Sequence, residues 1–225
     1  RWGTVASLAT KNSERNPPRA TATATALMLA VGLIVTLQVG TASARDTMLT
    51  EINRSKPVDV AVTWQDADGT LTAIPEAKRT ALAMAPGVAN SLQFAALTAL
   101  LTDSDSAFEL TVMGHDPAIV GLTDVTQAVG DDEILVDANQ AEFLAEVVKV
   151  QGPDGARDLR VVASKLADYD SALVSAATLV ELGRPIAGAV MWLSVPDRAA
   201  AVDALLQVNE VAGDSARIDG SLVEA

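Results

Sequence analysis

Residues 20–44 have the sequence ATATATALMLAVGLIVTLQVGTASA, a run of 25 residues without a charged side chain between Arg19 and Arg45. At a rise of about 1.5 Å per residue, a helix of this length extends about 37 Å, which exceeds the roughly 30 Å hydrocarbon core of a bilayer. The apolar centre is Ala26–Val39. The threonines of the run are tolerable there, because a threonine hydroxyl can bond to the carbonyl one turn earlier. We therefore interpret residues 20–44 as a transmembrane helix.

Two other interpretations of this run remain open. The run follows a basic region, and it ends in Ala42-Ser43-Ala44, so it also matches a secretory signal peptide with an A-x-A cleavage site. The 19 residues that precede the run count against that interpretation. A buried core helix is the third possibility, although a fully apolar run of this length is unusual in a soluble domain.

The charge of the chain is distributed unevenly on the two sides of this run. The first 21 residues carry four basic side chains and one acidic side chain, a net charge of +3. Since the whole chain of 225 residues carries −13, the remainder carries −16. Lys and Arg mark the cytoplasmic side of a membrane helix. We therefore expect a cytoplasmic N-terminus, a membrane location, and an extracytoplasmic domain formed by residues 45–225.

The composition excludes several classes of protein. Cysteine is absent, so the chain has no disulfide framework, no thiolate zinc site and no thiol nucleophile. A single histidine, His115, excludes any site that needs two. The net charge of −13 argues against a nucleic acid partner, because nucleic-acid-binding surfaces are basic. The phosphate-binding pattern G-x-x-x-x-G-K-[ST] is also missing, so we expect no ATP site of that type.

The N-terminal flank carries a motif. Residues 8–28 have the sequence LATKNSERNPPRATATATALM. This stretch resembles the start of a permease half in ABC transporters of the FtsX/MacB type, especially the actinobacterial ones. There the pattern runs roughly L-A-x-x-N-x-x-R-N-P-x-R-T-A-x-T-A-x-A-L-M and leads directly into a membrane helix. The polar core of the match is Asn12, Arg15, Asn16, Pro17 and Arg19.

The match has two departures, and further similarity is confined to short segments. Pro18 stands where the family usually has a basic residue, and Ala20-Thr21 inverts the usual Thr-Ala. Later in the chain, Ala85-Pro86-Gly87-Val88 and residues 112–117 (VMGHDP) also fit the family in pattern.

The resemblance implies both an architecture and partners. The outside domain of the family has a ferredoxin-like lobe formed by both ends of the domain and a β-rich lobe inserted between them, here about residues 103–165. The implied partners are a separate ABC ATPase subunit, the remaining permease helices or a second permease copy, and membrane lipids, whose phosphates Lys11, Arg15 and Arg19 can contact. The resemblance implies no cofactor.

Local sequence patterns predict the elements of the chain. An amphipathic segment at the inner membrane surface is expected over 5–15, within a cytoplasmic segment 1–19. Asn16-Pro17-Pro18 then breaks it, and the spanning helix starts near Arg19. Alternating or continuous apolar residues predict strands over 58–64, 70–74, 88–101, 108–114, 133–136, 147–150, 159–163, 186–194 and 217–219. Helices are expected over 75–84, 140–146, 171–182 and 196–211, the last with Val202, Leu205 and Leu206 on its apolar side. This order indicates an α+β domain in two lobes.

Three polar groupings could carry chemistry. Asp66-Ala67-Asp68-Gly69 resembles part of a calcium loop, but the further ligands are missing, so we interpret it as a turn. His115 next to Asp116 could form half of a proton-transfer pair, but no nucleophile can be assigned to it. The densest acidic cluster is Asp131-Asp132-Glu133 with Asp137, which we interpret as a solvated junction between a loop and a strand.

The sequence therefore predicts no catalytic, cofactor-binding or metal-ligating residue, and no enzyme. Trp64 and Trp192 lie in predicted strands and are expected in the core, while Trp2 is expected at the membrane interface. We expect a permease fragment of an ABC transporter, whose outside domain transmits or responds to ATP-driven movement of the membrane helices. The alternative is a single-pass anchored or secreted extracellular domain that binds or senses a ligand.

Overall fold

The computed structural model describes Gly3 and residues 17–55, 58–104, 106–123, 125–197 and 199–223. The chain divides into two compact units, Arg1–Thr50 and Glu51–Ala225. The predicted amphipathic segment over 5–15 and Trp2 lie outside the described residues.

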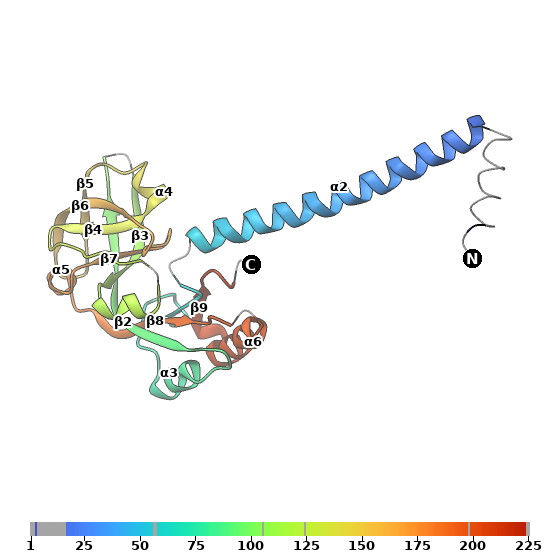
Figure 1. Cartoon of the computed structure of the whole chain (residues 1–225). Helices are drawn as coiled ribbons and strands as arrows, with labels where there is room; N and C mark the ends of the chain where they lie inside the picture. The colour runs from blue at the N-terminus through green and yellow to red at the C-terminus, as the bar shows by residue number, and fades with distance from the viewer. Residues whose placement is uncertain are drawn as a thin grey trace. The chain divides into compact units, whose positions relative to one another are not determined.

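A single helix, α2 (Pro17–Ser55), contains the whole uncharged run (Figure 1). Its 39 residues correspond to about 58 Å, longer than the predicted span at both ends. The predicted start near Arg19 was wrong by two residues, because proline is tolerated in the first turn of a helix, where its missing N–H has no helical acceptor. At the other end the helix continues through the charged residues 45–55, which contain no glycine or proline.

The segment Thr21–Ala44 of α2 is long and apolar enough to cross a membrane. Among the described residues, the side chains of this window are exposed along its whole length. The hydroxyl of Thr36 donates to the carbonyl of Gly32 at 2.8 Å, and that of Thr41 to the carbonyl of Leu37 at 2.9 Å. These bonds confirm how the threonines satisfy their polar groups in an apolar run.

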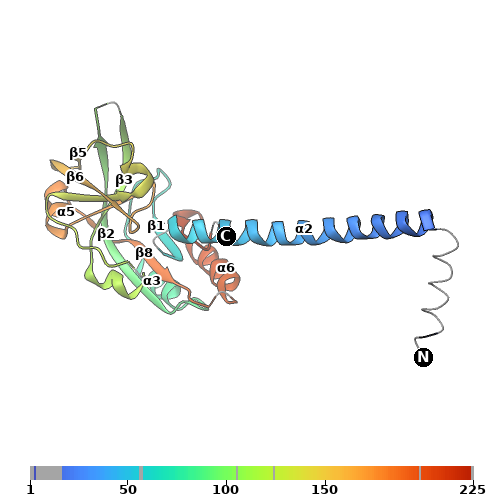
Figure 2. The ribbon, with the colours of Figure 1, turned by 45° about the horizontal axis from the view of Figure 1, so that its top comes forward.

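The second unit begins and ends in a ferredoxin-like lobe. Its strands are paired in the order β2-β8-β1-β9 and are antiparallel, and α3 and α6 lie side by side over one face (Figure 2). The elements in chain order are β1 (Val60–Trp64), α3 (Glu76–Ala83), β2 (Asn90–Thr102), β8 (Ile186–Ser194), α6 (Ala201–Ala212) and β9 (Ala216–Asp219). This order of two β-α-β units confirms the α+β prediction of a ferredoxin-like lobe made from both ends of the domain.

A β-rich lobe is inserted between β2 and β8. It contains β3 (Ala107–Gly114), η1 (Pro117–Gly121), β4 (Glu133–Asp137), α4 (Ala138–Ala141), β5 (Val147–Gln151), β6 (Ala156–Ser164), β7 (Ser171–Val174) and α5 (Ala176–Leu182). Strand neighbours follow the order β3-β7-β4-β6-β5-β2, and β2 pairs with β3 again, so the six strands close into a barrel. Closure leaves no free edge among these strands.

One strand, β2, belongs to both lobes. Its first part, Asn90–Ala96, pairs with β8, and its second part, Ala96–Thr102, pairs with β3. The register with β8 shifts between Phe94, which pairs with Val190, and Ala96, which pairs with Ile186, so the two extra residues belong to β8. Gly188, with φ +65°, lies in this irregular part of β8, while β2 continues from one lobe into the other.

Three apolar clusters hold the domain together. The first lies between the helices α3 and α6 and the strands β1 and β8, and it contains Trp64. The second fills the barrel. The third lies around Trp192, whose ring is 4.7 Å from that of Phe94 at an interplanar angle of 56°. Trp64 and Trp192 are both buried, which confirms their prediction as core residues.

Two predicted helices and one predicted strand need correction. Residues 171–182 are not one helix: Ser171–Val174 form β7, and Ser175 caps α5 by accepting from the backbone N–H of Thr178. The predicted helix over 140–146 is replaced by α4, because the carboxylate of Asp137 accepts from the N–H groups of Asn139 and Gln140 and begins the helix two residues earlier, at Ala138. The predicted strand over 70–74 is reduced to a single bridge between Gln65 and Leu71.

The buried face of α6 also differs from the prediction. The helix begins at Ala201, and small side chains at 201, 204 and 212 face the sheet together with Val208. Leu205 packs partly against this cluster, whereas Val202 and Leu206 are 67% and 64% exposed. Small residues let a helix approach a sheet closely, and here they define the buried stripe instead of the larger side chains.

The C-terminal segment is fastened to the start of the domain. The N–H of Ser221 donates to the carbonyl of Val58 at 3.1 Å, and that of Leu222 to Asp59 at 3.0 Å. Gly220 makes this possible, because its φ is +126° and a Cβ at this position would lie 2.5 Å from the carbonyl oxygen of Asp59.

Replacing Gly220 with alanine should therefore destabilise the domain. We expect Gly220→Ala to lower the free energy of unfolding by about 1–3 kcal/mol, because it adds backbone strain and a steric overlap. Urea unfolding of the full chain in an uncharged detergent, followed by tryptophan fluorescence, measures the change. Gly121→Ala is the matched control, since a Cβ there meets nothing within 4 Å. Equal stability of the two variants would contradict this account.

Candidate functional site

The membrane-proximal motif is only partly within the described residues. Asn12, Arg15 and Asn16 lie outside them, and Pro17 and Arg19 belong to the first two turns of α2. Their role therefore stays a prediction from the sequence.

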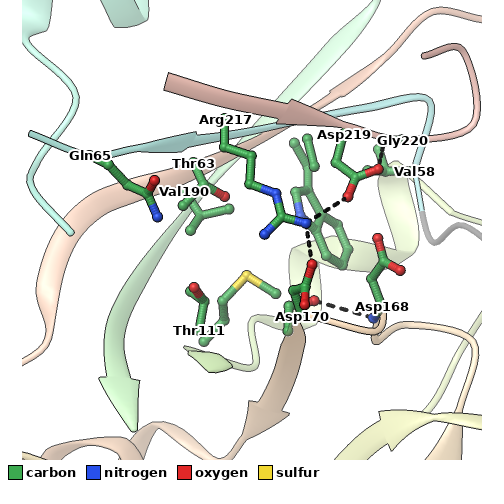
Figure 3. Close-up of a pocket in the computed structure, with 14 residues that line it drawn as sticks. Val58, Thr63, Gln65, Thr111, Asp168, Asp170, Val190, Arg217, Asp219 and Gly220 are labelled. Atoms are coloured by element: carbon green, nitrogen blue, oxygen red, sulfur yellow. Dashed lines mark hydrogen bonds and ion pairs between the residues drawn. The ribbon is translucent and has the colours of Figure 1, made fainter. Parts of the chain in front are cut away.

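Within the second unit, the two lobes meet at a polar cavity of about 50 Å³ (Figure 3). Its walls come from β1, β8 and β9 of the ferredoxin-like lobe, and from β3 and the segment before β7 of the inserted lobe. Arg217 of β9 points across the cavity toward Asp170, which immediately precedes β7 (Figure 3). The cavity is far smaller than the roughly 300–1,000 Å³ typical of small-molecule sites, so it suits a joint between lobes better than a ligand site.

Arg217 is surrounded by carboxylates. Its guanidinium forms an ion pair and hydrogen bond with Asp170, and its Nη2 lies 3.6 Å from Oδ2 of Asp219. The hydrogen bond that Arg217 donates to Asp170 raises the pKa of Arg217, partial burial opposes that shift, and the charges of Asp170, Asp219 and Asp168 raise the pKa further. A cation with a raised pKa in the folded state stabilises the fold at all pH values below its ordinary pKa, so this contribution is constant through neutral pH.

Backbone bonds fix the partners of Arg217. The N–H of Thr111 on β3 donates to the carbonyl of Asp170 at 3.0 Å, and the N–H of Gly220 donates to Oδ1 of Asp219 at 2.8 Å. The Arg217 and Asp170 side chains are 50% and 49% exposed, and an ion pair at this exposure contributes only about 0–1 kcal/mol. The pair therefore bridges the two lobes with little energy, while the shared strand β2 joins them.

Each of the other polar groupings noted in the sequence has a structural role of its own. The carboxylate of Asp116 caps η1 by accepting from the N–H of Ala118 at 2.8 Å, so it does not orient the imidazole of His115. In the predicted turn, Oδ1 of Asp66 accepts from the N–H groups of Asp68 and Thr70, and Gly69 takes φ +80°. These bonds confirm the turn interpretation of residues 66–69.

The acidic cluster is likewise divided among separate partners. Asp131 accepts from the hydroxyl of Ser175 at 2.5 Å, Glu133 pairs with Arg160, and Asp137 caps α4. Among the described residues, no group of three or more His, Asp or Glu side chains could hold a metal ion.

Sequence reasoning missed Arg217 as a joint residue and treated it only as the start of a last strand. Its main partner, Asp170, lies 47 residues earlier, directly before the helix predicted over 171–182. The available signal was a lone basic residue between Asp214 and Asp219 in a strongly acidic domain.

Comparison with known proteins gives similarity of structure only. No known family profile matches the chain, and no curated protein matches it in sequence. The periplasmic region of MacB from Actinobacillus actinomycetemcomitans is similar at 10% identity with a TM-score of 0.36, covering 77% of this chain and 94% of that one.

Two further solved structures are similar in the same way. The extracellular domain of the noncanonic ABC-type transporter YknZ from Gram-positive bacteria has 12% identity and a TM-score of 0.36, covering 72% of this chain and 99% of that one. A domain of a protein described as a permease from Porphyromonas gingivalis has 12% identity and a TM-score of 0.29, covering 74% of this chain and 88% of that one. At these TM-scores, none of the three bears on what this chain does.

The weak energy assigned to the joint can be tested with a double-mutant cycle. Arg217→Ala, Asp170→Ala and the double variant should give a coupling energy of about 0.2–1 kcal/mol, which should fall toward zero in 1 M NaCl because salt screens an exposed pair. Urea unfolding of the full chain provides the four free energies. A coupling above about 2 kcal/mol that persists in salt would contradict the weak energy assigned to this pair.

Proposed function

We propose that this chain is a piece of the permease subunit of an ABC transporter, and that its outside domain transmits or responds to ATP-driven movement of the membrane helices. The observation that carries the proposal is the motif Asn12, Arg15, Asn16, Pro17 and Arg19, which leads directly into the apolar part of α2. The ferredoxin-like lobe with its β-rich insertion supports it, because this is the domain architecture that the motif's resemblance implies.

The proposed arrangement has three parts. Residues 1–19 form a cytoplasmic segment, residues 20–44 span the cell membrane, and residues 45–225 form the extracytoplasmic domain. Its inserted lobe was expected at about 103–165 and runs from β3 to the end of α5 at Leu182. The continuity of α2 supports a mechanical role. Its apolar window Thr21–Ala44 is followed without a break by the charged residues 45–55, so a displacement of the membrane-spanning part is carried along one helix.

The way the domain closes on itself supports a place between membrane helices. Residues 58 and 59 at its start are hydrogen-bonded to residues 221 and 222 near its end. A domain inserted between two membrane helices needs its entry and exit side by side, and this one has them. The remaining permease helices, or a second permease copy, are the partners that this geometry would serve.

An ATPase subunit is the partner that the proposal requires. We expect the tagged full chain, extracted from its native membrane in mild detergent, to retain an ABC ATPase, since the basic N-terminal segment lies on the cytoplasmic side. The double variant Arg15→Glu and Arg19→Glu should lose most of that ATPase, because it inverts the charge of the segment. Quantitative mass spectrometry of the purified complexes measures the ratio.

The control for this experiment is Arg54→Glu, which reverses the charge of an arginine on the other side of the membrane-spanning window. It should retain the ATPase at the level of the unsubstituted chain. Absence of any ABC ATPase from the unsubstituted complex would contradict the proposal, and so would equal retention by all variants.

The second candidate function is a single-pass anchored or secreted domain that binds or senses a ligand outside the cell. Ala42-Ser43-Ala44 is the observation that favours its secreted form. The permease proposal predicts an uncut chain, because residues 20–44 must stay in the membrane. Intact-mass measurement of the protein from its native host distinguishes the two, since cleavage after Ala44 would give a product that begins at Arg45.

A further inference from the structure

A second hollow, which we call the aromatic groove, lies at one end of the inserted lobe and has a volume of about 340 Å³. Phe108 lines it from the start of β3, and Asn139 and Gln140 line it from α4. Phe143 and Leu144 come from the segment after α4, and Tyr169 comes from the segment before β7. The groove is separate from the cavity that contains Arg217, and it has the size of a typical binding site.

Two aromatic side chains of the groove face the solvent. Phe143 is 84% exposed and Tyr169 is 69% exposed, in a chain that has only three Phe, three Trp and one Tyr. Burial of such side chains normally stabilises a fold by about 1.5–3 kcal/mol each, and Trp64, Trp192 and Phe94 are buried in this one. Exposed aromatic residues around a hollow are typical of the centre of a protein interface.

The groove is held in place by bonds on its polar side. Nε2 of Gln140 donates to the carbonyl of Tyr169 at 2.7 Å, which ties α4 to the segment before β7. The carboxylate of Asp103 accepts from the N–H of Ala145 at 3.1 Å and fixes the segment that carries Phe143. The site is therefore largely formed in the free domain, which lowers the entropic penalty of binding.

The charges beside the aromatic residues indicate what the groove accepts. Glu142, which is exposed, adjoins Phe143. Residues 45–225 carry a net charge of −16. A second copy of this chain and an anionic lipid surface are both repelled by such a domain, whereas a cationic segment is attracted.

We propose that the aromatic groove docks a basic segment of a partner protein, which places one or two apolar side chains against Phe143 and Tyr169 while its Lys and Arg side chains face Glu142 and the acidic surface of the domain. This inference does not depend on the transport role, since it applies equally to an anchored binding domain. The apolar contacts provide most of the affinity, and the charges provide selection and speed of association.

A random dodecapeptide display library, selected on the full chain in uncharged detergent micelles at low salt, tests the proposal. The enriched peptides should combine Lys or Arg with Leu, Phe or Trp. The most enriched peptide, made synthetically and labelled, should bind at least about tenfold more weakly to Phe143→Ser and to Tyr169→Ser in fluorescence anisotropy. Its affinity should also fall when salt is raised from 50 to 500 mM, and for Glu142→Lys.

The matched control is Val180→Ser, which changes a side chain that is 64% exposed on α5 and does not line the groove. It should leave the affinity unchanged. Because Phe143, Tyr169 and Glu142 are exposed, their variants should keep the urea midpoint of the unsubstituted chain, which checks that they fold. Enrichment of acidic or uncharged peptides, no enrichment at all, or equal binding by the groove variants and the control would overturn the proposal.

Discussion

The structure depends on the constraint that α2 presents its apolar side chains to its surroundings on every side. Nine large apolar residues between Leu27 and Val39 are at least half exposed. Keeping them in water would cost on the order of 10 kcal/mol, which is comparable to the whole stability of a typical domain. A bilayer removes this cost, and the helix satisfies its own backbone groups, as a membrane requires. In a bilayer, the apolar window would therefore separate the basic N-terminal segment from the acidic domain.

The domain that follows is organised by a strand that belongs to both lobes. Because β2 pairs with β8 in its first part and with β3 and β5 in its second part, the ferredoxin-like lobe and the barrel share one backbone. The pairing of β8 with β2 is irregular near Phe94, and the half-exposed pair of Arg217 and Asp170 bridges the two lobes. Apolar packing within each lobe, and in the cluster around Trp192 that contains residues of both lobes, supplies the stability.

Local patterns predicted much of this fold. The alternation in Val58–Trp64 and the continuous apolar run of Ile186–Ser194 identified β1 and β8, and the uncharged run identified the apolar part of α2. The predictions failed where the hydrophobic pattern of a segment was ambiguous, or where a residue's partner lies far away in the sequence. Ser171–Val174 has the residues of a helix, and it is a strand because it completes the barrel between β3 and β4. Barrel closure and the pairing of Arg217 with Asp170 depend on residues far apart in sequence, so neither could be read locally.

The central claim is that residues 45–225 lie on the extracytoplasmic side of the membrane and residues 1–19 on the cytoplasmic side. It can be measured directly because the chain contains no cysteine. Single cysteines are introduced as Asp203→Cys, at an exposed position on α6, and as Ser13→Cys in the N-terminal segment. Intact spheroplasts are then treated with a membrane-impermeant maleimide. We predict that Asp203→Cys is labelled in intact cells and that Ser13→Cys is labelled only after the membrane is opened. Labelling of Ser13→Cys in intact cells, or protection of Asp203→Cys until lysis, would contradict the account.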